Sequence, residues 1–171
     1  SVYGSEWNPG IDNDSHVTVL IHPMDDEAGG YFKNADEYPR SMAQNSNQRE
    51  MIYLNSKYLE TPYIKIFLAH EFQHLLDFNQ KERKYNIQED TWLEESRAEY
   101  ASTLLGYDNV YKDSNLERRV HNFIDNKFDS ITEWQGVNAD YGALNLFAQD
   151  LAEQYGVRIL ADSLISTETG I

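Results

Sequence analysis

The sequence predicts an α+β fold, in which a small twisted N-terminal sheet packs on a long helix and a mainly helical half follows. Strand-like runs occur only in residues 1–60, whereas apolar residues recur at helical spacing from residue 61 onward. Strands and helices that are segregated along the chain favour α+β over an alternating α/β fold. The 171 residues are enough for one domain with its own core. We therefore expect a single domain over residues 1–171, with strands and loops in 1–60 and helices in 61–171.

Three short segments are expected to form the sheet. Residues 16–22 are rich in β-branched side chains and end before Pro23. Residues 50–55 read as a second strand. Between them the chain is rich in turn formers, and only residues 31–32 are expected to add an edge strand.

Helical spacing predicts five helices in the rest of the chain. The first is expected to begin with Thr61 as the cap and Pro62 at the first helical position. The second is expected to begin with a capping box from Thr91 to Glu94 and to end at Gly106. The expected helices cover residues 61–80, 92–105, 114–124, 140–155 and 157–166.

The composition limits the classes of function. The chain carries 29 Asp and Glu against 14 Lys and Arg, a formal charge of −15, so nucleic acids and anionic membranes are not expected partners. No apolar run approaches the length of a membrane span. The absence of cysteine excludes disulfides, thiol nucleophiles and cysteine-ligated metals. Any transition-metal site must therefore use histidine and carboxylate ligands.

The motif His70-Glu71-Phe72-Gln73-His74 lies inside the first expected helix. Side chains four residues apart share a helix face, so the two imidazoles can bind one Zn²⁺ ion, and Glu71 is placed to act as the general base. Apolar neighbours such as Phe67 and Leu75 would bury the other faces and leave this polar strip at a cleft. The alternative is a solvated helix face. We interpret the motif as a zinc site, which needs a third protein ligand.

Three kinds of third ligand can be compared with the sequence. A histidine ligand in an extended H-E-x-x-H-x-x-G-x-x-H motif is excluded, because Asp77 and Gln80 occupy the required positions. An aspartate ligand is disfavoured, because Asn138 stands where the aspartate would be. A glutamate on a second helix fits, since Glu95 stands 21 positions after His74.

Two glutamates compete for this role. Glu94 has a local function as the third residue of a helix capped by Thr91, whereas Glu95 shares a helix face with Glu99. We therefore expect Glu95 to bind the metal and Glu99 to orient His70 through its outer ring N–H. Glu94 remains the alternative ligand, and the three acids could also form a solvated face.

These residues resemble the gluzincin metallopeptidases, in which H-E-x-x-H is followed by a glutamate ligand, often within Trp-Leu-Asn-Glu. The stretch here is Trp92-Leu-Glu-Glu95, with Glu94 where asparagine is common. Residues 29–32 and 35–39 also resemble a group of uncharacterised extracellular bacterial peptidases related to the hyicolysin-like enzymes. The resemblance extends over roughly residues 7–156 and is most specific at the two metal-binding motifs.

The resemblance implies a zincin-like fold, one catalytic Zn²⁺ and hydrolysis of peptide bonds in a protein or peptide substrate. Glu71 would carry a proton from water to the leaving amine. Tyr141 is the candidate donor to the oxyanion, with His121 as the alternative. The resemblance also implies a secreted bacterial enzyme whose signal peptide is not in this chain. An aminopeptidase Gly-x-Met-Glu-Asn motif is absent, so we expect an endopeptidase, and we assume a monomer.

Other features have simpler interpretations. Asp12-Asn13-Asp14 and Asp25-Asp26-Glu27 offer oxygen ligands for Ca²⁺, but neither has the spacing of a defined calcium loop, and solvated turns are expected. A substrate could add as a strand beside residues 50–55 or 29–33. The alternative to an enzyme is a peptidase-like binding or adhesion module that keeps the metal site. Glu71 argues against it, because such a module has no need of a general base.

Overall fold

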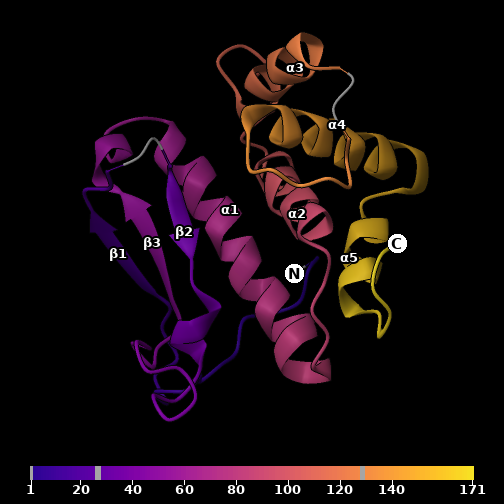
Figure 1. The fold of residues 1–171 in the computed structure, drawn as a ribbon. Helices are drawn as coiled ribbons and strands as arrows, with labels where there is room; N and C mark the ends of the chain where they lie inside the picture. The colour runs from indigo at the N-terminus through magenta and orange to yellow at the C-terminus, as the bar shows by residue number, and fades with distance from the viewer. Residues whose placement is uncertain (1, 26–27, 128–129) are drawn as a thin grey trace.

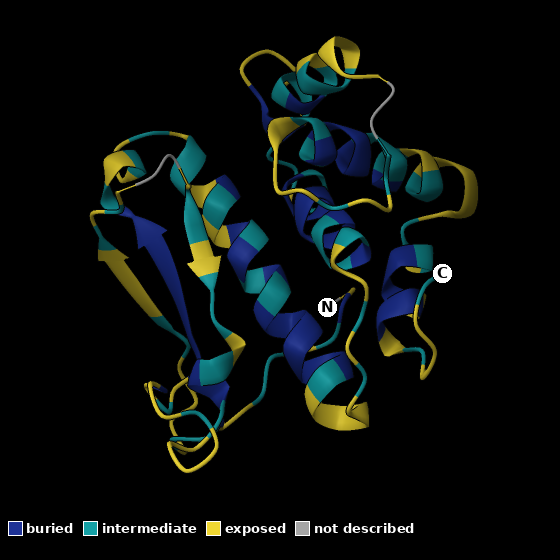
Figure 2. Ribbon diagram, in the orientation of Figure 1, coloured by how far each residue is buried: buried dark blue, intermediate teal, exposed yellow. Residues whose placement is uncertain are grey.

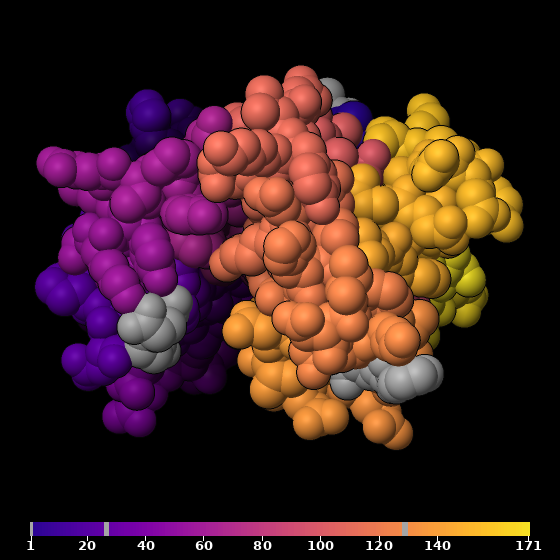
Figure 3. All heavy atoms as spheres, turned by 90° about the horizontal axis from the view of Figure 1, so that it is seen from above, coloured from indigo at the N-terminus to yellow at the C-terminus, as the bar shows by residue number. Residues whose placement is uncertain are grey.

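The computed structural model describes residues 2–25, 28–127 and 130–171. It confirms the α+β class: a three-stranded sheet lies on one side of the molecule, and five α-helices occupy the centre and the other side (Figure 1). Seen from above, the end of α2 and the segment that contains α3 fill the middle of the surface, between the sheet side and the C-terminal helices (Figure 3). None of the helices in the described residues is long and apolar enough to cross a membrane.

The sheet has the strand order β1-β3-β2. β1 (Thr18–His22) runs parallel to β3 (Met51–Asn55), and β2 (Gly30–Phe32) pairs antiparallel with β3. All five residues of β3 are buried, whereas the middle of β1 is exposed (Figure 2). The expectation that residues 50–55 could receive an added substrate strand is therefore wrong, because β3 is central and both its edges are paired. The expected edge strand at residues 31–32 is confirmed.

β2 lies directly against the long helix α1 (Tyr63–Asp77) because two glycines allow it. A Cβ atom on Gly29 would stand 2.2 Å from the Phe67 ring of α1. One on Gly30 would stand 2.5 Å from the Tyr53 carbonyl oxygen of β3 and 3.0 Å from the Glu71 Cγ atom of α1. Both distances are shorter than a carbon contact permits. The pair Gly29-Gly30 thus sets how closely the edge strand approaches the helix.

Both expected N-terminal caps are wrong in detail. Pro62 occupies the cap position of α1, and the Thr61 hydroxyl instead donates to the Tyr58 carbonyl at 2.8 Å. α2 (Thr91–Leu104) has Asp90 at its cap without a side-chain hydrogen bond, so the box between Thr91 and Glu94 does not form. The C-terminal expectation holds, since Gly106 follows α2 with a φ of 76°.

The remaining helices follow the expected order. α3 (Asn115–Asp125) is capped by the Ser114 hydroxyl, which accepts from the Glu117 N–H. α4 (Asn138–Tyr155) ends at Gly156, and α5 (Arg158–Ile165) follows it. α1 runs on as a π-helical segment, Phe78–Arg83, where a polar connection was expected from residue 81. The main apolar cluster joins the N-terminal segment to α1, α2, α4 and α5 and contains Tyr3, Leu76, Tyr100, Ala148, Leu160, Ala161 and Leu164.

Candidate metal centre

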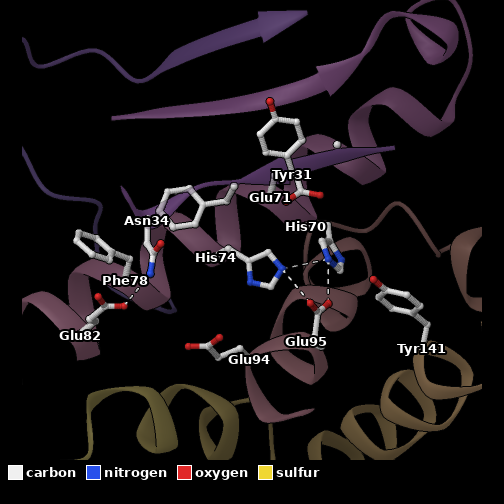
Figure 4. Close-up of a pocket in the computed structure, with 12 residues that line it drawn as sticks. Tyr31, Asn34, His70, Glu71, His74, Phe78, Glu82, Glu94, Glu95 and Tyr141 are labelled. Carbon is white, nitrogen blue, oxygen red and sulfur yellow. Dashed lines mark hydrogen bonds and ion pairs between the residues drawn. The ribbon is translucent and has the colours of Figure 1, made fainter. Parts of the chain in front are cut away.

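Two neighbouring helices bring three possible metal ligands together. His70 and His74 stand one turn apart on α1, and Glu95 faces them from α2. One ligand atom from each of these residues lies within 4.8 Å of the others. The two Nε2 atoms are 3.2 Å apart, and Glu95 approaches His70 Nε2 at 3.2 Å and His74 Nε2 at 3.7 Å. Figure 4 shows the three side chains pointing toward one another.

The donor set fits a divalent transition metal. Two imidazoles and one carboxylate are the ligands that a catalytic Zn²⁺ keeps when its fourth position is open. The contacts among the side chains themselves are incomplete, because the Oε2 atom of Glu95 is buried without a hydrogen bond of acceptable geometry. Ring nitrogens that face each other satisfy one another only if one is protonated and the other is not. The ring nitrogens of the two histidines and the carboxylate of Glu95 are therefore buried electron-pair donors that face one common point.

Glu99, also on α2, lies behind His70. Its Oε1 atom is 3.4 Å from His70 Nδ1, the ring nitrogen that points away from the cluster. Arg119 donates to both carboxylate oxygens, at 2.7 and 2.6 Å, and Asn115 and Asn145 add hydrogen bonds at 3.2 and 3.3 Å. Burial opposes the ionisation of Glu99, but the Arg119 guanidinium and the His70 ring outweigh it and hold the pKa of Glu99 below its usual range. Glu99 is thus an ionised acceptor aimed at His70 Nδ1.

Glu71 is separate from the ligand group. It lies under β2, is 6% exposed, and lines the same cavity as the two histidines (Figure 4). Burial raises its pKa, while the positive fields of His70 and His74 oppose the shift and Glu95 reinforces it. A carboxylate whose affinity for a proton is raised by its surroundings is suited to general base catalysis.

Tyr141 reaches the cluster from the first turn of α4. Its ring centroid is 6.2 Å from that of His70, and it is held between the Trp134 ring, 5.0 Å away, and the Arg119 guanidinium, 4.5 Å away. Burial, together with the negative charges of Glu95 and Glu99, raises the pKa of its hydroxyl, so the group stays protonated. Tyr141 can therefore donate a hydrogen bond into the cavity. The alternative donor, His121, is exposed on α3.

The structure distinguishes the two competing glutamates. Glu95 belongs to the ligand group and Glu94 does not. Because the expected capping box is not formed, Glu94 is free to turn toward the cavity, which it lines. Burial, followed by the charge of Asp77, raises the pKa of Glu94 to about 8. The prediction that Glu95 faces the histidines rested partly on a capping role for Glu94, and the structure does not show that role.

Some residues around the site were not expected. Arg119, Asn115 and Asn145 hold Glu99, yet they come from α3 and α4 and belong to no local motif. Only the tertiary arrangement of three helices brings them together, so no spacing in the sequence marks them. Their common function is to fix the carboxylate that faces His70.

The acidic clusters do not form a second metal group. Among the described residues, the group of His70, His74 and Glu95 is the only one in which three or more acidic or histidine side chains converge. Asp12 pairs with Arg49 at 3.2 Å, and Asp14 pairs with the exposed His16 at 2.6 Å. Residues 26 and 27 of the other cluster lie outside the described residues. Ca²⁺ binding, the alternative to the expected solvated turns, thus has no support in the described part of the chain.

Comparison with known proteins found one distant relationship of note. The chain is similar to the neutral metalloprotease ShpI of Staphylococcus hyicus, with 26% identity over 168 residues that cover 84% of this chain and 36% of ShpI. It therefore spans about a third of the length of that relative. No family model matches the chain, and no solved structure matches it. The similarity to ShpI supports a relationship to the metallopeptidases.

Proposed function

We propose that residues 1–171 form one zincin-like catalytic domain of gluzincin type, which hydrolyses internal peptide bonds of protein or peptide substrates with one Zn²⁺ ion. One observation carries this proposal: His70, His74 and Glu95 converge in a cavity of about 350 Å³ that also contains the buried carboxyl of Glu71. The name of ShpI, a neutral metalloprotease, supports the same class of activity.

His70, His74 and Glu95 would hold the ion. Glu99 orients the ring of His70, because an ionised acceptor at Nδ1 keeps the proton on that nitrogen and leaves the Nε2 lone pair facing the other ligands. When bound, Zn²⁺ supplies Lewis acidity toward a carbonyl oxygen and lowers the pKa of water.

Glu71 is proposed as the general base. It takes the proton of the attacking water and delivers it to the nitrogen of the leaving amine, so that the carboxyl ends the cycle as it began. Its position between β2 and the histidines shields it from bulk water.

Tyr141 is proposed to stabilise the oxyanion. Its hydroxyl is protonated, lines the cavity and comes from a different element than the base, so the two groups can act on opposite sides of one carbonyl carbon. β2 is the sheet edge next to the cavity and can align an extended substrate through backbone hydrogen bonds. A secreted location is proposed from the resemblance to extracellular bacterial peptidases.

The test compares the wild-type chain with Glu71→Gln. Zinc content is measured by elemental analysis and cleavage by release of peptides from casein. We expect about one zinc per chain in both proteins and activity in the wild type alone. The absence of zinc in the wild type would refute the metal site, whereas zinc without any cleavage would favour the binding-module alternative.

A further inference from the structure

A second cavity, of about 510 Å³, adjoins the first on the other side of His70. The two share Gly30, His70, Glu71 and Tyr141, so a chain bound across the site would pass from one to the other. Beyond the shared residues, their linings differ in charge. The charged residues of the first are Glu82, Glu94 and Glu95. The second is lined by the rings of Tyr58, Tyr63 and Phe67, by Arg118 and Arg119, and by the single acid Glu99.

The two arginines are adjacent on α3 but have different partners. Arg119 is neutralised by its two hydrogen bonds to Glu99. Arg118 donates through Nη2 to the amide oxygen of Asn115 at 2.7 Å, and its Nε atom is buried without a hydrogen-bond partner. Among the described residues no carboxylate lies within ion-pair distance of Arg118. Arg118 therefore has no ion pair of its own, although the carboxylate of Glu99 attracts its charge from a greater distance.

This arrangement is costly unless something else supplies the missing charge. The guanidinium of Arg118 lies 5.9 Å from the ring centroids of both Tyr63 and Phe67, and ring faces attract a cation only weakly compared with a carboxylate. Burial, followed by the repulsion of Arg119, lowers the pKa of Arg118. A buried N–H without a partner is disfavoured. The chain keeps this unpaired cation at the wall of a cavity although it has 29 acidic residues.

We propose that the second cavity binds the carboxylate of a substrate Asp or Glu side chain, at one of the two positions that flank the scissile bond. This inference rests on the proposed peptidase function. Arg118 would donate to the carboxylate through its guanidinium, and the rings of Tyr63 and Phe67 would pack against the methylene groups of the same side chain. Arg119 adds a positive field, but two of its donors, Nε and Nη2, remain bonded to Glu99.

The proposal predicts a preference for acidic side chains at a single substrate position. This is the opposite of the preference expected from the net charge of −15. A uniformly acidic surface would favour basic or neutral peptides at every position. The second cavity instead predicts one position at which acidic side chains are selected, while the acid-lined first cavity would repel them. The preference should therefore be confined to one side of the cleaved bond.

The first measurement is a cleavage profile on a mixture of peptides with all side chains at each position. In the wild type, Asp and Glu should be enriched about tenfold or more over Asn and Gln at one flanking position, as expected for a charge-assisted hydrogen bond. Arg118→Gln should abolish the enrichment, Arg118→Lys should retain part of it, and Arg118→Glu should replace it with a preference for Lys and Arg. The exposed Arg158, changed to Gln, is the matched control.

A binding measurement separates this inference from the proposed function. In a zinc-loaded Glu71→Gln background, calorimetry compares two peptides that differ only by Glu or Gln at the selected position. Preferential binding of the Glu peptide that Arg118→Gln removes would support the inference even if no peptide is cleaved. Cleavage with no acidic preference, or a preference that persists in Arg118→Glu protein with a native circular dichroism spectrum, would overturn it and leave the peptidase function intact.

Discussion

Two polar clusters lie around helices α1 and α2, and they differ in whether acids and bases of the chain form ion pairs within them. The metal cluster consists of His70, His74 and Glu95. The core cluster consists of Asp77 on α1, Lys81 in the π-helical segment, Glu89 in the connection to α2 and Arg97 on α2, and its side chains are 2% exposed or less. In the core cluster two acids balance two bases, with Arg97 Nε 3.2 Å from Asp77 and Lys81 Nζ 2.5 Å from Glu89.

We interpret the difference as one between a structural cluster and the proposed metal site. The core cluster finds its counter-charges inside the chain, so it serves the fold. The metal cluster brings two ring nitrogens together and leaves a buried carboxylate oxygen without a hydrogen bond. Arg97 Nη2 of the core cluster is also buried without a hydrogen bond, so the contrast lies in the chemistry: two ring nitrogens and a carboxylate that converge on one point can bind a cation. The predictions below test this separation and run from the largest to the smallest expected effect on peptide hydrolysis.

The largest effect is expected from Glu95→Gln. Removal of a ligand should lower zinc affinity by more than the roughly 10–100-fold typical of outer-shell changes, and hydrolysis should fall to background. Competition with a zinc chelator measures the affinity. Glu94→Gln is the matched control, because Glu94 lines the cavity but is outside the ligand group. Zinc loss in Glu94→Gln with retention in Glu95→Gln would reverse the assignment.

Tyr141→Phe should have the next largest effect. Loss of one oxyanion donor lowers kcat by about 10²–10³, while zinc affinity stays unchanged, because the hydroxyl is not a ligand. Steady-state kinetics on a quenched fluorescent peptide measures both kcat and KM. Tyr31→Phe, a change at another tyrosine of the same cavity, should leave kcat near the wild-type value. An unchanged kcat in Tyr141→Phe would exclude the proposed role.

Arg97→Met should affect stability and leave the chemistry intact. Asp77 and Glu89 would lose a buried partner, which typically costs about 3–5 kcal/mol in the free energy of unfolding. Urea denaturation measures the loss, and kcat at a temperature where the variant is folded should equal that of the wild type. A fall in zinc affinity of the folded variant would show that the two clusters are not separate.

The smallest effect on hydrolysis is expected from Glu37→Gln, a change at a third acidic site. Glu37 and Glu50 are each 2% exposed, and burial together with Glu50 raises the pKa of Glu37 to about 9. The folded state thus holds a proton that the unfolded state releases near pH 4.5, so stability falls as the pH rises from there toward 9. The variant should lack this decline.

Urea denaturation at pH 5, 7 and 9 measures the decline, with the exposed Glu60→Gln as control. Wild type and Glu37→Gln should differ most at pH 9, where the variant should be the more stable protein. An equal pH dependence in all three proteins would show that Glu37 does not carry the proton.

The parts of the fold that could be predicted are those that local patterns encode. The periodicity of α1 and the position of Gly106 depend on neighbours a few residues away, and both expectations hold. The strand order could not be predicted, because which of β2 and β3 is central depends on long-range pairing. The predicted cap of α2 is wrong because Thr91 is the first residue of the helix and Asp90 occupies the cap position.

The same limit applies to the site. His70, Glu71 and His74 follow from one helical turn, and Glu95 follows from the spacing between two helices that pack together. The contacts that hold Glu99, and the unpaired Nε of Arg118, depend on how α3 and α4 cross α2. Short-range sequence patterns do not encode how these helices cross, so the roles of these residues can be inferred only from the folded structure.

The place of Tyr3 has a consequence for how the protein assembles. This N-terminal residue is 3% exposed and is packed in one cluster with Leu160 and Leu164 of α5. The apolar core is thus closed by segments from the two ends of the sequence, and such long-range contacts slow folding. A nascent chain that has already released His70 and Glu71 from the ribosome still lacks the last part of its core. The apolar cluster that α1 shares through Leu76 is therefore incomplete until α5 has been synthesised.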